Sequence, residues 1–71
     1  MSIIAINARN QFKGVIVEII RGPVVSEVDV EISGGVVTSV VTTRSLDSLG
    51  LELGAEVLTI FKSTEVMLAK L

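Results

Sequence analysis

Short runs rich in valine and isoleucine, each followed by turn residues, restrict this chain to a fold built from β-strands. The clearest run covers residues 24–32, in which small or apolar residues alternate with acidic ones. An alternation of period two places one face of a strand against a core and the other face in solvent. The Arg-Gly-Pro segment at 21–23 and the Ser-Gly-Gly segment at 33–35 are turn sequences. The run therefore predicts an antiparallel strand between two tight turns.

Further extended runs cover residues 3–6, 12–20, 36–42, 55–62 and 65–69. The pattern changes after residue 42, where Thr42 or Thr43 can cap a helix, and Gly50 can end it. From these six runs we expect about five strands, with one short helix before the run at 55–62. We therefore predict an all-β fold, an OB-like five-stranded antiparallel barrel with one short helix, as a single domain over residues 1–71.

The run at 12–20 is apolar on both faces. Simple alternation places Val15, Val17 and Ile19 on one face, and Ile16 and Ile20 on the other. A strand with two apolar faces is typical of a segment that is covered on both sides. We expect the barrel core on one side and a neighbouring subunit on the other.

The size and composition of the chain favour self-association. It has 71 residues, no cysteine and no histidine, and 49% of its residues are hydrophobic. A domain this small usually needs a disulfide, a metal or an oligomer for stability. The absent residue types remove disulfides, the commonest zinc ligands, and Ser–His and Cys–His catalytic pairs. We therefore expect a homo-oligomer that is not an enzyme.

Charge and hydropathy exclude two further classes. The net charge is −2, from 6 basic and 8 acidic residues, and the only aromatic residues are Phe12 and Phe61. Nucleic-acid binding generally needs an excess of basic residues, and single-strand binding needs several stacking rings. No apolar run approaches the roughly 18–20 residues needed to cross a bilayer, and the amino terminus does not resemble a signal peptide. We expect no nucleic-acid partner, no membrane partner and a cytoplasmic location.

Three polar segments are candidates for an anion site. Residues 7–10 and 62–64 each place one cation, Arg9 or Lys62, among side-chain donors at a strand boundary. Residues 42–45 form the expected helix start, where amide groups carry partial positive charge. Each segment alone is consistent with an ordinary polar surface. If the fold brings all three together, they would form a cage of donors suited to a tetrahedral dianion.

At these residues the chain resembles the molbindin (Mop) family and the TOBE domains of molybdate transporters and regulators. Residues 6–14 read Ile-Asn-Ala-Arg-Asn-Gln-Phe-Lys-Gly, similar to the opening of the family, Ile-Ser-Ala-Arg-Asn-Gln-Leu-Lys-Gly. Residues 61–68 read Phe-Lys-Ser-Thr-Glu-Val-Met-Leu, similar to its ending. Asn7 stands in the place of the usual serine. Phe12 and Phe61 stand in the place of aliphatic residues, and we interpret both as packing residues.

The resemblance implies intracellular binding and storage of molybdate or tungstate at the subunit interfaces of a hexamer, built as a trimer of dimers. It implies one set of oxyanion-binding residues from two subunits: Asn7, Ala8, Arg9, Lys62, Ser63 and Thr64 of one, with Thr42 and Ser45 of the other. The resemblance also implies a second class of site near a threefold axis, which we place at the backbone around Gly22 and Val24. The alternative functions are an oxyanion-sensing or structural module acting through a protein partner, and a nucleic-acid-binding OB barrel.

Overall fold

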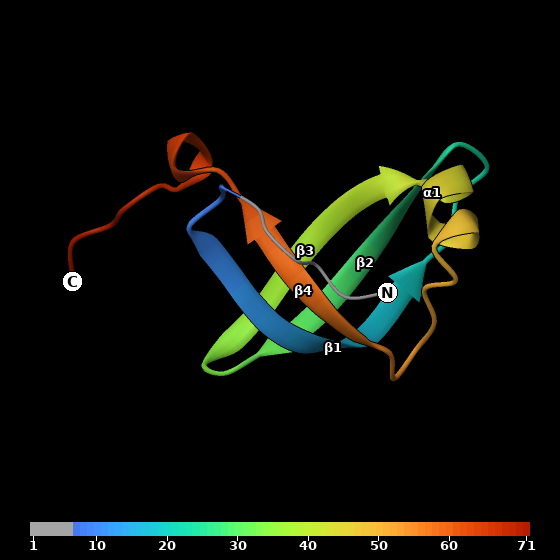
Figure 1. The fold of residues 1–71 in the computed structure, drawn as a ribbon, viewed down its shortest axis with the longest axis horizontal. Helices are drawn as coiled ribbons and strands as arrows, with labels where there is room; N and C mark the ends of the chain where they lie inside the picture. Colours follow the sequence, from blue (N-terminus) through green and yellow to red (C-terminus); the bar gives the residue numbers. More distant parts are fainter. Residues whose placement is uncertain (1–6) are drawn as a thin grey trace.

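A computed structural model describes residues 7–71 of the chain. Four antiparallel strands form one sheet in the order β3-β2-β1-β4. The strands are β1 (Asn10–Ile20), β2 (Val25–Ile32), β3 (Gly35–Thr42) and β4 (Glu56–Phe61). Helix α1 (Thr43–Ser48) separates β3 from β4, and a single turn of 3-10 helix, η1 (Ser63–Glu65), follows β4. The sheet curls into a half-barrel, with α1 at one end and η1 at the other (Figure 1).

The strands predicted at 12–20, 24–32, 36–42 and 55–62 are confirmed, as is the short helix before the last of them. The strand predicted at 3–6 lies outside the described residues. The strand predicted at 65–69 is wrong, because Glu65 ends η1 and the following residues run away from the sheet (Figure 1). An extended segment becomes a strand when a neighbouring strand pairs with its backbone. No other part of residues 7–71 pairs with this segment.

A β-bulge at Val17 interrupts the pairing of β1 with β2, because the register passes from Ile16 directly to Glu18. One extra residue reverses the alternation of faces along the rest of a strand. Ile19 therefore packs against the core, whereas Ile20 is 53% exposed. The predictions that Ile16 shares a face with Ile20, and Val17 with Ile19, are wrong for this reason. In β2, which has no bulge of its own, the predicted alternation is confirmed.

The fully buried core is small. Ile16 of β1, Val28 and Val30 of β2 and Leu46 of α1 are each no more than 3% exposed. Burying one such side chain contributes about 1.5–3 kcal/mol. Helix α1 therefore plugs one end of the half-barrel by inserting a single leucine between the strands. The wider concave face of the sheet stays open to solvent.

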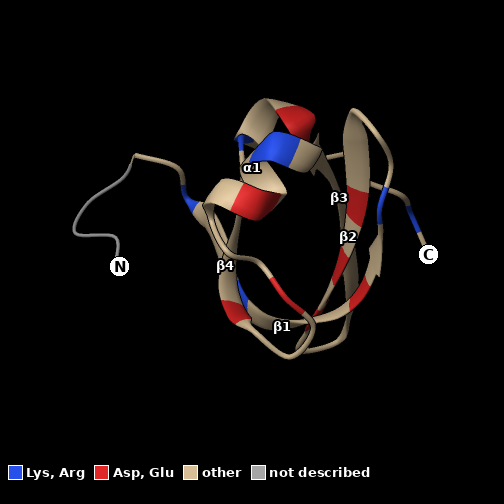
Figure 2. Cartoon of the chain, turned by 90° about the vertical axis from the view of Figure 1, so that its right-hand side faces the viewer, with Lys and Arg blue, Asp and Glu red and all other residues tan. Residues whose placement is uncertain are grey.

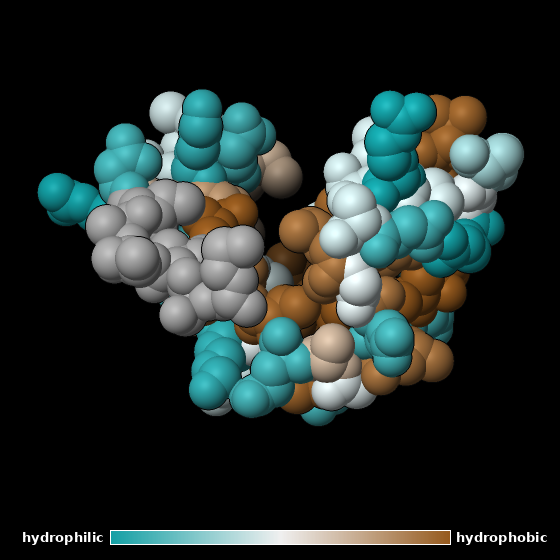
Figure 3. Space-filling model, turned by 45° about the vertical axis from the view of Figure 1, so that its right-hand side comes forward, coloured by the Kyte–Doolittle hydropathy of each residue, from teal (hydrophilic) through white to brown (hydrophobic). Residues whose placement is uncertain are grey.

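That open face forms an apolar groove of about 570 Å³. Valine, leucine and isoleucine side chains from β2, β3 and β4 line it, together with Ile16 and Leu51. Figure 3 shows the hollow with its hydrophobic lining. Large apolar surface on a soluble protein usually marks a site that another molecule covers. In the part of the chain described here, no helix is both long and apolar enough to cross a membrane.

Both ends of α1 are stabilised by local hydrogen bonds. At its start, the Thr42 hydroxyl accepts a hydrogen bond from the Ser45 amide at 3.1 Å, as expected of an N-cap threonine. At its end, Gly50 adopts a φ of 64°, in the left-handed region that favours glycine. The amides of Gly50 and Leu51 donate to the carbonyls of Asp47 and Leu46 in a Schellman motif. The sequence therefore specifies a helix of this length at this place.

Candidate functional site

The antiparallel pairing of β1 with β4 brings the two ends of the described chain together. The ladder runs from Val15 opposite Glu56 to Asn10 opposite Phe61. Residues just before Asn10 and just after Phe61 must therefore leave the sheet side by side. The side chain of Gln11 donates a hydrogen bond to the carbonyl of Ala8, which fixes the segment leading into β1.

A pocket of about 520 Å³ lies where these segments meet. We call it the Arg9–Lys62 pocket. Its lining consists of Asn7, Ala8, Arg9, Ile60, Phe61, Lys62, Ser63 and Thr64. Six of the eight predicted site residues thus lie around one cavity within a single chain. They come from two segments, 7–9 and 62–64, that are more than fifty positions apart in the sequence. Two of the three predicted polar segments therefore meet within one chain, whereas the cage hypothesis requires all three.

The Arg9–Lys62 pocket carries positive charge. The ion pairs in the described part of the chain join Lys13 to Glu56, at 3.5 Å, and Arg21 to Asp47, so neither pocket cation has an acidic partner there. The guanidinium offers several fixed donors and the ammonium a point charge. The lining residues Asn7, Ser63 and Thr64 add neutral amide and hydroxyl donors. This combination suits a small anion whose oxygens accept hydrogen bonds.

Thr42 and Ser45 do not lie in this pocket. Thr42 is the N-cap of α1 and Ser45 lies in its first turn, at the opposite end of the molecule from η1 (Figure 1). The Thr42 hydroxyl donates to the Ser45 hydroxyl at 2.8 Å; Thr42 is exposed, and Ser45 is half-buried. A smaller pocket there, of about 320 Å³, is lined by Pro23, Val24, Thr42 and Arg44. The third polar segment could therefore complete the Arg9–Lys62 pocket only from another copy of the chain, which is the arrangement predicted from the resemblance.

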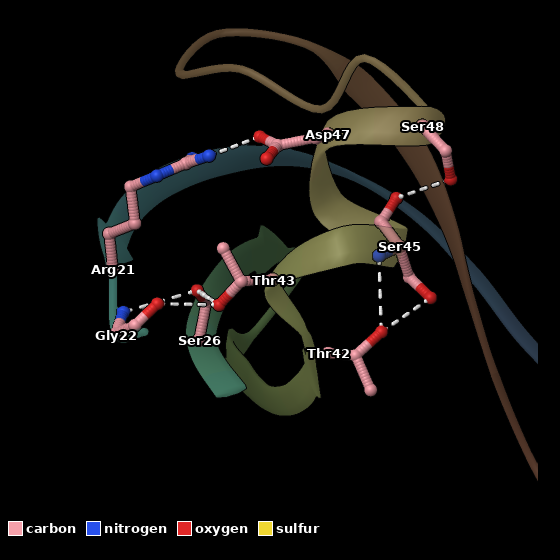
Figure 4. A network of polar contacts seen from close by, with 8 residues as sticks. All are labelled: Arg21, Gly22, Ser26, Thr42, Thr43, Ser45, Asp47 and Ser48. Atoms are coloured by element: carbon pink, nitrogen blue, oxygen red, sulfur yellow. Dashed lines mark hydrogen bonds and ion pairs between the residues drawn. The ribbon is translucent and has the colours of Figure 1, made fainter. Parts of the chain in front are cut away.

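A buried hydrogen-bond network holds this second polar surface in place (Figure 4). Ser26 is 2% exposed, and its hydroxyl lies 2.7 Å from that of Thr43, the first residue of α1. Thr43 also donates to the carbonyl of Gly22 at 2.7 Å. An ion pair between Arg21 and Asp47 closes the same region. The turn before β2 and the start of α1 therefore form one connected unit.

Sequence reasoning missed three residues beside these surfaces. Ile60 and Phe61 form an apolar wall of the Arg9–Lys62 pocket, and Arg44 lines the pocket beside Thr42. Ile60 and Phe61 are the last two residues of β4, immediately before Lys62, so their proximity to Lys62 in the sequence was the available signal. The described residues contain no group of three acidic, histidine or cysteine side chains able to hold a metal ion. Both pockets instead present hydrogen-bond donors.

Comparison with known proteins gives matches over nearly the whole chain. The family model described as the TOBE domain matches residues 6–68. "Molybdenum-pterin-binding protein 2" of Clostridium pasteurianum is 45% identical over 65 residues, covering 90% of this chain and 96% of that protein. The solved structure of MopII from the same organism superimposes with a TM-score of 0.86 at 43% identity, covering 93% of this chain and 100% of the other.

A second solved structure is that of a protein with its ligand bound. The cytoplasmic molybdate-binding protein ModG, solved with molybdate bound, has a TM-score of 0.78 at 35% identity. The match covers 83% of this chain and 43% of the ModG chain. The OB-like half-barrel with its single helix is thus common to this chain and to these proteins.

Proposed function

The chain belongs to the TOBE-domain family, and on this basis we propose that it binds molybdate or tungstate reversibly, without changing the ion chemically. Relatives and structural neighbours named for molybdenum or molybdate support this choice of ligand. The sequence has no histidine or cysteine, so Ser–His and Cys–His nucleophile pairs cannot form, which supports binding over that type of catalysis. The family assignment is compatible with one domain over residues 1–71.

The observation that carries the proposal is the Arg9–Lys62 pocket. A tetrahedral dianion has four oxygens that accept hydrogen bonds and none that donates, so it needs a cage of donors. The pocket supplies two cations and the neutral donors of Asn7, Ser63 and Thr64. Ala8 lies between Asn7 and Arg9 and also lines the pocket. Acidic and basic residues are otherwise interspersed over the molecule (Figure 2), which does not favour a nucleic-acid surface.

In this proposal the site is completed by a second copy of the chain. Thr42 and Ser45 of the partner would close the Arg9–Lys62 pocket from the side that faces solvent in one chain. Two features support self-association: the apolar groove, and the segment after η1, in which Met67 and Leu68 are 93% and 94% exposed. We propose a homo-oligomer, a hexamer built as a trimer of dimers, in which such segments pack on neighbouring copies.

The biological role that fits best is storage and buffering of the oxyanion in the cytoplasm. A ligand held between subunits stabilises the assembled form by mass action, so binding and assembly are linked. The description of ModG as a cytoplasmic molybdate-binding protein supports the compartment. A shared tetrahedral shape and charge mean that molybdate and tungstate would occupy the same cage.

Calorimetric titration with sodium molybdate tests the proposal. Arg9→Ala and Lys62→Ala should each lower the affinity by about tenfold to a hundredfold, because a hydrogen bond to a charged group contributes about 1.5–3 kcal/mol. Lys13→Ala is the matched control, because it removes an exposed cation that is paired with Glu56 outside the pocket. Its affinity should equal that of the wild type.

Two results would contradict the proposal. If the wild-type protein does not bind molybdate, the function is wrong. If it binds molybdate equally well in both pocket variants, the assigned site is wrong. Native mass spectrometry of the same samples, with and without molybdate, reports subunit number and bound ions together. A stable complex with another protein and no bound oxyanion would favour the sensing or structural alternative.

A further inference from the structure

Two phenylalanines stack beside the Arg9–Lys62 pocket. The ring centroids of Phe12 and Phe61 are 5.8 Å apart, and the ring planes differ by 20°. The register explains the contact, because Phe12 lies opposite Thr59 and Phe61 lies opposite Asn10. The two phenylalanines are therefore diagonal neighbours on one face of the β1–β4 ladder, a separation that aromatic rings can span. This pair holds every aromatic ring of the chain.

Phe61 lines two different cavities. It contributes to the Arg9–Lys62 pocket and also to the apolar groove on the concave face. Phe61 is partly buried, whereas Phe12 is 45% exposed and belongs to neither lining. Phe12 thus packs against Phe61 without contributing to either cavity wall. Phe12 therefore supports the ring of Phe61, which lies between the charged pocket and the groove.

An apolar wall beside two cations affects anions of different size differently. Burying a charge next to apolar groups costs more when the ion is more strongly hydrated, as a smaller ion of equal charge is. A wall that is fixed in place also prevents the pocket from contracting around a smaller ion. Both effects disfavour sulfate relative to the larger molybdate, whereas the cations attract both dianions.

We propose that Phe61 is a specificity-determining residue of the Arg9–Lys62 pocket, favouring larger tetrahedral dianions over sulfate, and that Phe12 positions it. The inference rests on the proposed function, since it concerns the same pocket. Phe61 acts as the wall against which the ion is held. Phe12 acts through the stack, by restricting the side-chain positions that Phe61 can adopt. Arg9 and Lys62 supply attraction, and the aromatic pair supplies discrimination.

The experiment is a double-mutant cycle in which the measured quantity is the ratio of the affinity for molybdate to the affinity for sulfate. Sodium molybdate and sodium sulfate are titrated by calorimetry into the wild type, Phe61→Leu, Phe12→Leu and the double variant, at one pH and ionic strength. A change of a few carbon atoms in a pocket alters discrimination by about tenfold or more. We expect the molybdate-to-sulfate ratio to fall about tenfold in Phe61→Leu and about threefold in Phe12→Leu.

The double variant separates positioning from general stability. If Phe12 acts through Phe61, then Phe12→Leu should change the ratio no further once Phe61 is leucine. Val40→Ala is the control, because it truncates an apolar side chain that is 67% exposed on β3, the strand at the other edge of the sheet. It should leave the ratio unchanged. If Phe61→Leu does not fold, the single Phe12→Leu variant still decides, because its ring is near the surface.

Three outcomes would overturn the inference or part of it, and each has a different consequence for the proposed function. Molybdate binding with an unchanged ratio in Phe61→Leu and Phe12→Leu would refute the selectivity role alone and leave the proposed function intact. A wild-type protein that binds neither dianion would refute the proposed function and this inference with it. A ratio that falls in Phe61→Leu but falls equally again in the double variant would refute the positioning role of Phe12.

Discussion

The hydroxyl of Ser26 lies 2.7 Å from the hydroxyl of Thr43, which joins the buried face of β2 to the first residue of α1. The Ser26 hydroxyl also accepts a hydrogen bond from the Gly22 amide at 3.3 Å, and Thr43 donates to the Gly22 carbonyl. Three segments of the chain therefore share one buried polar cluster (Figure 4). This cluster holds the start of α1, and with it the N-cap Thr42 and Ser45 in the first turn.

Ser26→Ala should lower the free energy of unfolding by about 1–2 kcal/mol, because the Gly22 amide loses its acceptor and the Thr43 hydroxyl loses one of its two hydrogen bonds. Urea denaturation followed by circular dichroism measures the change. Ser48→Ala is the control, since Ser48 is exposed and makes a single hydrogen bond of 3.3 Å. Its effect should be within about 0.5 kcal/mol of zero. An equal decrease in the free energy of unfolding for both variants would show that the cluster around Ser26 adds no more stability than an exposed hydrogen bond.

Gly14→Ala should destabilise the fold strongly, by about 3 kcal/mol, because an added methyl group has no space. A Cβ at Gly14 would lie 2.5 Å from the Glu31 carbonyl oxygen and 2.6 Å from Val30 Cγ1. Gly35→Ala is the matched control at the start of β3, where nothing lies within 4 Å of an added Cβ. Thermal unfolding should show a large decrease for the first variant and almost none for the second. A tolerated Gly14→Ala would mean that β1 and β2 can separate at little cost.

Thr42→Val should reduce both helix stability and molybdate affinity. It removes the N-cap hydrogen bond to Ser45, which costs about 1 kcal/mol, and it removes a hydroxyl that the proposal assigns to the neighbouring subunit's site. Thr42→Ser restores the cap and should restore binding. Thr38→Val is the control, because it loses one exposed hydrogen bond, to Asp29, away from the cap. Calorimetry that finds the affinity of Thr42→Val unchanged would exclude Thr42 from the site.

Leu68→Asp should shift the assembly toward smaller species. Leu68 is 94% exposed in the isolated chain, so the substitution costs the folded chain little, but a carboxylate cannot be buried against an apolar neighbour. Light scattering after size-exclusion chromatography measures the mass. Lys70→Ala, two residues away, should keep the wild-type mass. An unchanged mass in Leu68→Asp would show that this segment does not pack on another copy.

Local sequence determined most of the elements. Alternation in β2, the turns on either side of it and the threonine and glycine signals around α1 act over a few residues, so each could be read directly from the sequence. The motif at residues 6–14 and the motif at 61–68 likewise identified Arg9 and Lys62 as candidates. Such signals depend on neighbours in the chain, which sequence shows.

Pairing between distant segments decided the rest. The bulge at Val17 depends on the register of β1 against β2, and a shift of one residue reverses every later side chain. The run at 65–69 has the composition of a strand but no partner strand in the described chain, so its backbone does not pair. The pocket exists because Asn10 lies opposite Phe61. Composition and periodicity specify what each segment can form, whereas hydrogen bonds across the sheet decide which segments meet, because they join residues that the linear sequence keeps apart.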